Sequence, residues 1–273
     1  DVDAHTYNMD PAKLEAAIKA VRAEGRLTPK VVIAVDLFGQ PADYPAIRAI
    51  CDRHGLKLIS DSAQGFGCTL NGDHPLKWAD VTTTSFFPAK PLGCYGDGGA
   101  IFTEDAELAA VLRSLRIHGQ NVEDKYDNQR VGLTGRLDTI QAAVLLEKLK
   151  IFNDEIAARN RVAARYNDAL RDLVDVPEVP EGLTSTWAQY TIRLRGRDRA
   201  AVIAKLTEQG IPTAIYYPRP LHRQTAYKDN PIPGNGLPVS DKLAGEVLSL
   251  PMHPYIDEAL QSRIIEGARQ ALA

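Results

Sequence analysis

Residues 31–61 read VVIAVDLFGQPADYPAIRAICDRHGLKLISD, and this stretch decides the class of fold. Two short apolar runs, 31–35 and 56–60, have the length and composition of strands. Between them, the apolar residues of 44–54 recur at helical spacing and are followed by Gly55, which predicts an amphipathic helix. Continuous apolar strands that alternate with helices are typical of a mostly parallel sheet covered on both faces.

The rest of the chain divides into a continuation of this pattern and a smaller unit. Segment 137–170 has helical spacing without Gly or Pro, which predicts one long helix or two nearly continuous ones. We expect an α/β fold with a large domain at 1–136, a linking helix at 137–173 and a small α+β domain at 174–273. The other predicted strands are 81–86, 99–102, 186–194 and 213–217, and the other predicted helices are 105–116, 199–209, 241–250 and 257–272.

The composition is that of an ordinary globular protein, with 44% apolar and 25% charged residues among 273. A net charge of −3 gives no electrostatic reason to expect binding to nucleic acid or to an anionic membrane. No apolar run approaches the ~20 residues of a membrane span, and the N-terminus lacks the features of a signal peptide. Three widely spaced cysteines fit neither a disulfide framework nor a zinc site, so we expect reduced thiols in a cytoplasmic protein without a metal.

Polar residues follow the predicted strands at the ends where open α/β sheets bind ligands. Asp61 ends one strand and is followed by Ser62-Ala63-Gln64, and Ser85 closes the next strand shortly before Lys90. A glycine cluster at 93–99 comes directly after. Taken singly, such an acid is more typical of a turn or helix cap, and such a lysine of a solvated surface.

Together these residues have the chemistry that pyridoxal phosphate (PLP) requires. A carboxylate such as Asp61 keeps the cofactor's pyridine nitrogen protonated. A lysine such as Lys90 binds the aldehyde as a Schiff base and afterwards carries the proton. The phosphate needs hydroxyl and backbone N–H donors, for which Ser85 is the candidate.

The sequence resembles the DegT/StrS family of nucleotide-sugar aminotransferases over essentially its whole length. Within that family its motifs are closest to those of enzymes that aminate UDP-2-acetamido-2-deoxy-3-oxo-glucuronate. The motifs that carry the resemblance are ISDSAQ at 59–64, TSFFPAK at 84–90, GDGG at 96–99, HGQ at 118–120, GRLDTIQAA at 135–143, GIPTAIYYP at 210–218 and LSLPMHPY at 248–255.

The resemblance implies a fold-type-I PLP transferase that works as a homodimer with active sites at the interface. Asp61 would then bind the pyridine nitrogen and Gln64 the phenolic oxygen of the cofactor. Ala63 would pack on one ring face, Ser85 would hold the phosphate and Lys90 would form the Schiff base. The implied reaction is a ping-pong transamination of a keto sugar linked to a nucleoside diphosphate, with L-glutamate as the amino donor, for amino-sugar biosynthesis.

The same resemblance assigns Thr134 to the cofactor, and Arg136, Tyr216 and Tyr217 to the phosphate or sugar across the interface. Close relatives have an Asn-x-Arg motif where this chain has Thr134-Gly135-Arg136, and a threonine offers one hydroxyl instead of an amide's paired donors. The hexuluronate enzymes have His-Tyr-Pro where this chain has Tyr216-Tyr217-Pro218. A neutral phenol there makes a 3- or 4-keto-6-deoxy sugar a competitor to a uronate substrate.

Family members also carry a segment before the part that this sequence resembles, with a Gly-Thr/Ser loop for the phosphate and an aromatic ring that stacks on the cofactor. No such loop precedes the first strand here, so we expect a fragment or a truncated relative. Two alternatives to the aminotransferase remain. A PLP-dependent sugar dehydratase shares the fold but has a histidine in place of Lys90, and a non-catalytic relative would bind a partner subunit or a nucleotide sugar.

Overall fold

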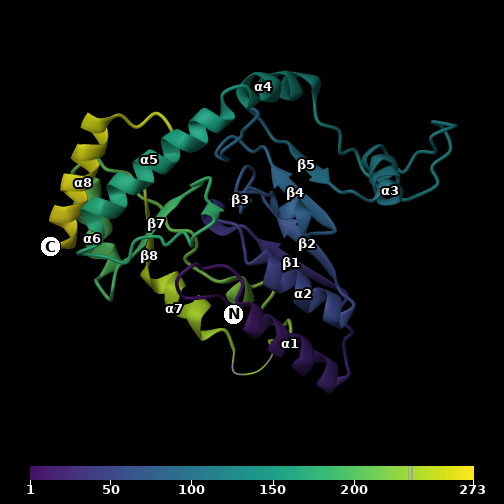
Figure 1. Ribbon diagram of the computed structural model, residues 1–273, viewed down its shortest axis with the longest axis horizontal. Coiled ribbons are helices and arrows are strands. Elements are labelled where there is room, and N and C mark those ends of the chain that lie inside the picture. Colours follow the sequence, from purple (N-terminus) through teal and green to yellow (C-terminus); the bar gives the residue numbers. More distant parts are fainter. Residues whose placement is uncertain (233, 235) are drawn as a thin grey trace.

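The structure is a computed structural model that describes residues 1–232, 234 and 236–273 (Figure 1). Its α-helices are α1 (Pro11–Glu24), α2 (Tyr44–His54), α3 (Ala106–Arg116), α4 (Thr139–Leu149), α5 (Phe152–Leu170), α6 (Arg199–Glu208), α7 (Pro238–Glu246) and α8 (Glu258–Leu272). Its strands are β1 (Val31–Val35), β2 (Lys57–Asp61), β3 (Thr69–Leu70), β4 (Val81–Ser85), β5 (Gly99–Phe102), β6 (Leu183–Thr184), β7 (Tyr190–Arg193) and β8 (Val247–Leu250). Short 3-10 helices occur at η1 (Leu37–Gly39), η2 (Pro75–Lys77) and η3 (Leu221–Arg223).

The central sheet has the strand order β1-β2-β4-β5. β1, β2 and β4 are parallel, and β5 runs antiparallel to β4. The prediction of a mostly parallel α/β sheet is therefore confirmed. In register, Val35 pairs with Asp61 and Asp61 pairs with Thr83, so the carboxyl ends of β1, β2 and β4 lie at one edge.

Helices cover one face of this sheet and leave the other open in the described residues. Ile18 of α1 and Ile47 of α2 share a buried core with Val32 and Leu58 of the sheet. The residues that alternate with these point to the opposite face, where apolar side chains are exposed to solvent. They are Val31, Ile33 and Val35 of β1 and Ile101 of β5. The expectation that both faces are covered is thus wrong for this part of the chain.

Two nearly continuous helices connect the sheet to the C-terminal unit, as the spacing predicted (Figure 1). At the beginning of α5, Phe152 and Ile156 pack with Phe86 and Leu92, which follow β4. The second half of α5 contributes Val162, Ala163, Tyr166 and Leu170 to the largest core cluster, shared with β7, β8, α6 and α8. One helix therefore packs against both halves of the molecule.

The C-terminal unit differs from the sequence prediction at two places. The predicted helix at 241–250 is confirmed for 241–246 and wrong for 247–250, because α7 ends at Glu246 and β8 follows it, paired antiparallel with β7. Periodicity cannot distinguish a four-residue buried strand from the end of a helix. The predicted strand at 213–217 is also absent: Ala214 alone exchanges backbone hydrogen bonds with Ser249, at 2.8 and 3.2 Å. β7 is shorter than the predicted 186–194.

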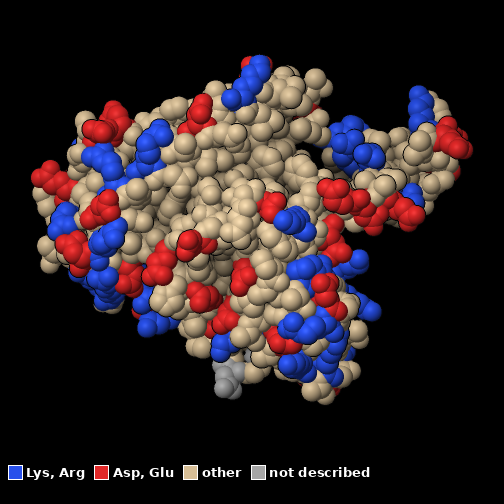
Figure 2. All heavy atoms as spheres, viewed as in Figure 1, with Lys and Arg blue, Asp and Glu red and all other residues tan. Residues whose placement is uncertain are grey.

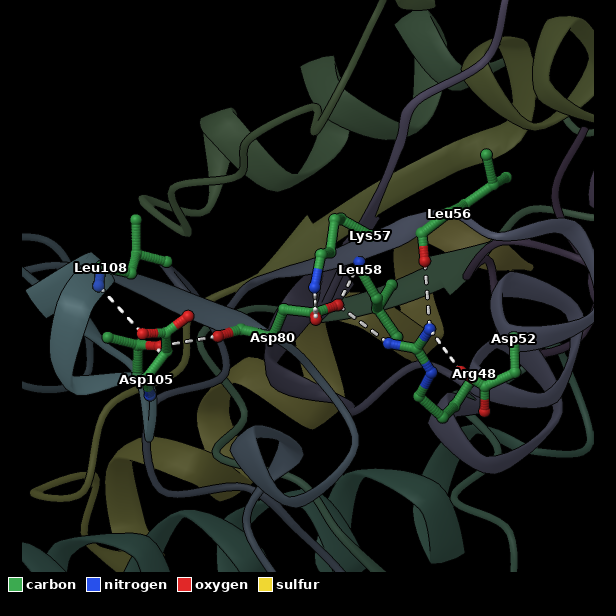
Figure 3. Close-up of polar contacts among 9 residues, drawn as sticks. Arg48, Asp52, Leu56, Lys57, Leu58, Asp80, Asp105 and Leu108 are labelled. Atoms are coloured by element: carbon green, nitrogen blue, oxygen red, sulfur yellow. Dashed lines mark hydrogen bonds and ion pairs between the residues drawn. The ribbon is translucent and has the colours of Figure 1, made fainter.

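At the amino ends of β2 and β4, Asp80 collects hydrogen bonds from several donors (Figure 3). Its carboxylate accepts from Arg48 Nη1 and Lys57 Nζ, both at 2.9 Å, and from the Leu58 N–H at 2.8 Å. Partial burial would raise the pKa of Asp80, but the N–H of Leu58 and the two cations outweigh it and hold the pKa below its usual value. At this end of the sheet the carboxylate is therefore paired with cations and a backbone N–H, and it has little capacity left to bind a ligand.

The surface carries charges of both signs. On the face shown in Figure 2, lysine and arginine side chains are interspersed with aspartate and glutamate, which agrees with the small net charge of −3. Cys51, Cys68 and Cys94 are free and buried, as the sequence predicted. None of the helices in the described part of the chain has the length and hydropathy needed to cross a membrane.

Candidate active site

The carboxyl edge of the sheet brings two of the predicted residues together. Asp61 is the last residue of β2 and Ser85 is the last residue of β4, the neighbouring parallel strand. Because Asp61 pairs with Val35 and Thr83, it belongs to the face that α1 and α2 do not cover. Both side chains are half-buried. They are therefore accessible to a ligand that lies on the open face.

The carboxylate of Asp61 is only partly satisfied by the protein. Its Oδ1 accepts one hydrogen bond, from the Ala63 N–H at 3.0 Å. Among the described residues no Lys, Arg or His makes an ion pair with it. A half-buried carboxylate that accepts only one backbone hydrogen bond can accept another from a protonated nitrogen of a ligand.

Lys90 lies in a turn after β4 that is held by backbone hydrogen bonds. The Lys90 N–H donates to the Phe87 carbonyl at 2.9 Å, and the Phe86 N–H donates to the Gly98 carbonyl at 2.7 Å. The side chain of Lys90 is half-buried, and its amine makes no hydrogen bond or ion pair within the described residues. In the same turn, Ser85 Oγ accepts from the Phe87 N–H at 3.2 Å, so its own hydrogen remains free to donate.

Gln64 is buried, and its amide orientation is fixed. Its Oε1 accepts from the Phe38 N–H at 2.6 Å, which leaves Nε2 as the donating side. Nε2 donates to the Tyr217 hydroxyl at 3.2 Å and has a second hydrogen available. Burial raises the pKa of Tyr217, so the phenol stays neutral. We expected Tyr217 to act across an interface, but here it reaches Gln64 of its own chain.

The remaining predicted residues are arranged less closely. Thr134 and Arg136 are exposed on the segment between α3 and α4, which extends away from the body of the molecule (Figure 1). Thr134 Oγ1 lies 3.3 Å from His118 Nε2, and neither residue contacts Asp61 or Lys90 in the described residues. Tyr216 lies edge-on to Tyr217, with ring centroids 5.6 Å apart. Ala63 is half-buried beside Asp61. The roles assigned to these residues stay predictions.

One residue that supports this site was not predicted. The hydroxyl of Thr186, which precedes β7, donates to the Gln64 carbonyl at 2.7 Å, and the Thr186 N–H donates to the Gly39 carbonyl at 2.9 Å. Gly39 has a φ of +97°, and a Cβ there would lie 2.9 Å from the Ala188 nitrogen, so only glycine allows this approach. Nothing in the local sequence around Thr186 indicates a partner so distant along the chain.

These groups fit PLP. An unpaired carboxylate, an unpaired amine, an amide with a free N–H and a hydroxyl on neighbouring strand ends match the pyridine nitrogen, aldehyde, phenolic oxygen and phosphate of that cofactor. The fold and this site define a fold-type-I PLP-dependent enzyme.

Comparison with known proteins identifies the family. The model of the DegT/DnrJ/EryC1/StrS aminotransferase family matches residues 1–269. The chain is 48% identical, over 262 residues, to the UDP-2-acetamido-2-deoxy-3-oxo-D-glucuronate aminotransferase of Pseudomonas aeruginosa; the match covers 95% of this chain and 68% of the relative.

Solved structures agree. A DegT/DnrJ/EryC1/StrS aminotransferase from Brucella abortus has 54% identity and a TM-score of 0.96, with 100% of this chain and 72% of that one covered. NtdA from Bacillus subtilis, solved with pyridoxamine phosphate bound, has 32% identity and a TM-score of 0.86, with 100% and 61% covered. The protein belongs to the DegT/DnrJ/EryC1/StrS aminotransferase family, whose members are PLP-dependent aminotransferases.

Proposed function

We propose that this protein transfers an amino group to the keto carbon of a sugar linked to a nucleoside diphosphate, with L-glutamate as the donor. The observation that carries the proposal is the placement of Asp61 and Ser85 at the carboxyl ends of neighbouring parallel strands, with Gln64 and Lys90 on the segments that follow them and with neither Asp61 nor Lys90 in an ion pair within the described residues. The name of the Pseudomonas aeruginosa relative supports a nucleotide-linked keto sugar as the substrate class.

The residues divide the chemistry among them. PLP, when bound, supplies an electron sink for the pair left when a bond at the donor's Cα breaks. Asp61 would hold the proton on the pyridine nitrogen, and the free N–H of Gln64 Nε2 would donate to the phenolic oxygen. Lys90 Nζ would bind the aldehyde carbon and would carry the proton to and from the donor's Cα. The hydroxyl of Ser85, which is free to donate, would bind the phosphate.

Two keto sugars fit this proposal. A 3-oxo uronate is the substrate in the name of the Pseudomonas aeruginosa relative. A 3- or 4-keto-6-deoxy sugar suits the neutral phenols of Tyr216 and Tyr217, because no imidazolium stands there to meet a sugar carboxylate. Tyr217 already lies against Gln64, which supports a place for the sugar beside the cofactor's phenolic oxygen.

We further propose that the working unit is a cytoplasmic homodimer in which Thr134 and Arg136 serve the site of a second copy. Their exposure, and that of Val122 and Val131 on the same segment, supports such a contact. The domain division at 1–136, 137–173 and 174–273 is also a proposal, and it is supported by the packing of α5 against both halves.

Borohydride reduction in the presence of PLP, followed by peptide mass mapping, tests the function. We expect one adduct, on Lys90, that is lost in Lys90→Ala and also disappears when L-glutamate is added before reduction. Lys57→Ala is the matched control, because Lys57 lies on β2 at the opposite end from Asp61. An adduct scattered over several lysines, or none, would contradict the proposal and favour a protein that binds without chemistry. Release of a product that lacks a new amino group would indicate a dehydratase instead.

A further inference from the structure

Asp36 is a buried carboxyl group with no part in the chemistry described above. It directly follows β1 and is 0% exposed. Since Val35 and Asp61 are paired, the alternation of side chains sends Asp36 to the covered face, opposite to Asp61. The Asp36 N–H donates to the Asp61 carbonyl at 3.0 Å, so the two residues are neighbours in adjacent strands.

All the hydrogen-bond donors to Asp36 are neutral. Tyr44 of α2 donates its hydroxyl to Oδ1 at 2.7 Å, the Ala42 N–H donates to Oδ1 at 3.3 Å, and the Ser62 hydroxyl donates to Oδ2. Within the described residues no Lys, Arg or His pairs with this carboxylate. The titratable groups on its own face are Tyr44 from α2 and Cys68 from the loop after β2, and Asp61 acts on it through its charge from the other face of the sheet.

Burial, with a smaller contribution from the negative charge of Asp61, raises the pKa of Asp36 to about 7 in spite of the lowering by its three donors. The same burial, together with the charge of Asp36, raises the pKa of the Cys68 thiol, which therefore stays neutral. Asp36 thus differs from an ordinary surface carboxylate, which is fully ionised near neutral pH.

The donors to Asp36 belong to a closed group of hydroxyls. Ser60 Oγ lies 2.8 Å from the Tyr44 hydroxyl and 3.1 Å from Ser62 Oγ. A phenol has one hydrogen, so Tyr44 can donate to Asp36 only while it accepts from Ser60. When Asp36 takes up a proton it becomes a donor itself, and any hydroxyl that accepts this hydrogen must direct its own hydrogen to another partner.

The loop at 61–65 packs directly against the Asp36 side chain. Ser62 is the residue next to Asp61, and Gly65 approaches so closely that a Cβ there would lie 2.6 Å from Asp36 Oδ2. A change in the hydrogen bonding of the Ser62 hydroxyl therefore takes place one residue away from Asp61.

We propose that Asp36 is a positioning residue for Asp61: through Ser62 and the paired backbone, it sets the charge and hydrogen bonding of the 61–65 loop and thereby the orientation of the Asp61 carboxylate. The importance of this role for the reaction rests on the proposed function, because there Asp61 holds the proton of the pyridine nitrogen. The coupling between the two carboxyl groups belongs to this chain alone and can be measured without cofactor.

The first test is a pH titration of the cofactor-free protein by NMR with ¹³C-labelled aspartate carboxyl groups. We expect the chemical shift of the Asp61 carboxyl carbon to change at the pH where Asp36 titrates, and this change to vanish in Asp36→Asn. Asp43→Asn is the matched control, because Asp43 is exposed and only caps α2. An Asp61 resonance that does not respond at that pH in the wild type, or that responds unchanged in Asp36→Asn, would overturn the inference.

A second variant keeps the test decisive if Asp36→Asn does not fold. Ser62→Ala removes a hydrogen bond that favours the ionised form, so the Asp36 inflection must move to higher pH. An inflection that stays in place or moves to lower pH would count against the inference.

The cofactor-loaded protein separates this inference from the proposed function. In Asp36→Asn we expect borohydride capture at Lys90 to persist, the absorbance of the bound cofactor to titrate at a shifted midpoint, and kcat to fall by roughly tenfold. Loss of capture in the wild type, with the Asp36–Asp61 coupling intact, counts against the proposed function only. Normal capture without any coupling counts against this inference only.

Discussion

Asp80 and Asp36 lie at opposite ends of the same sheet and are treated in opposite ways. Asp80, at the amino ends, receives Arg48, Lys57 and the Leu58 N–H, and its pKa is held low. Asp36, at the carboxyl ends, receives only neutral donors, and its pKa is raised to about 7. One end of the sheet has charges that neutralise each other, whereas the other keeps groups that can exchange protons or bind a ligand. We therefore expect substitutions at the amino ends to affect mainly stability, and substitutions at the carboxyl ends to affect mainly ligand binding and catalysis.

The largest expected effect comes from Asp61→Asn at the carboxyl edge. The variant removes the negative charge that would keep a pyridine nitrogen protonated, so kcat for transamination is expected to fall by roughly 10²-fold or more. Stability should change little, because Asp61 accepts only one hydrogen bond from the protein. Steady-state kinetics and urea unfolding of the same preparation check both halves of this prediction. If Asp61→Asn stays active, or mainly loses stability, the proposed difference between the two ends of the sheet is contradicted.

Asp80→Ala should show the reverse pattern. It leaves Arg48, whose side chain is only 21% exposed, without its main partner and removes the acceptor of the Leu58 N–H, so we expect a loss of about 2–3 kcal/mol in the free energy of unfolding. Activity at low temperature should be retained. Asp52→Ala is the control, because Asp52 pairs with the same arginine but is 67% exposed, and its removal should cost less than about 0.5 kcal/mol.

The pH dependence of stability sharpens the comparison. Because the pKa of Asp36 is raised in the folded protein, its contribution to stability is complete below the unfolded-state pKa and is lost as the pH rises through about 7. Relative to Asp36→Asn, the wild type should therefore lose stability by up to a few kcal/mol between about pH 4 and pH 8. Chemical unfolding of both proteins at several pH values measures this difference. A difference that grows with pH in favour of the wild type would show that Asp36 is ionised and stabilised in the fold.

The smallest expected effect is that of Tyr217→Phe. It removes the acceptor of one Gln64 N–H while leaving the ring, and the bond concerned is 3.2 Å long and half-exposed. We expect a two- to fivefold rise in KM for the sugar, in line with about 0.5–1 kcal/mol for one neutral hydrogen bond, with kcat nearly unchanged. An equal loss in kcat would mean that the phenol acts on the reacting atoms. Tyr216→Phe is the matched comparison.

The sequence made some of these features predictable for physical reasons. Helix α2 was predicted with its bounds because the apolar spacing and Gly55 act locally, and the structure adds Asp43 as its N-terminal cap. Asp61, Ser85 and Lys90 could be selected because strand ends and motif order are visible along the chain. β8 was missed because its identity depends on pairing with β7, far away in sequence.

Asp36 could not be recognised in advance. An acid after a strand usually indicates a turn, and only the packing of Tyr44 and Ser62 over it shows that it is buried. For the same reason no pattern indicated that Thr186 donates a hydrogen bond to Gln64 in the 61–65 loop, since the contact joins residues more than a hundred positions apart.

The contacts of Thr186 bear on how the enzyme handles its substrates. Many two-domain enzymes close around a ligand by rotating one domain about a hinge. Here Thr186 of the C-terminal unit donates hydrogen bonds to the backbone carbonyls of Gln64 and Gly39. A rotation of that unit would therefore break hydrogen bonds to the loop that carries Gln64. Any movement of the C-terminal unit during substrate exchange is therefore coupled to the backbone that positions Gln64.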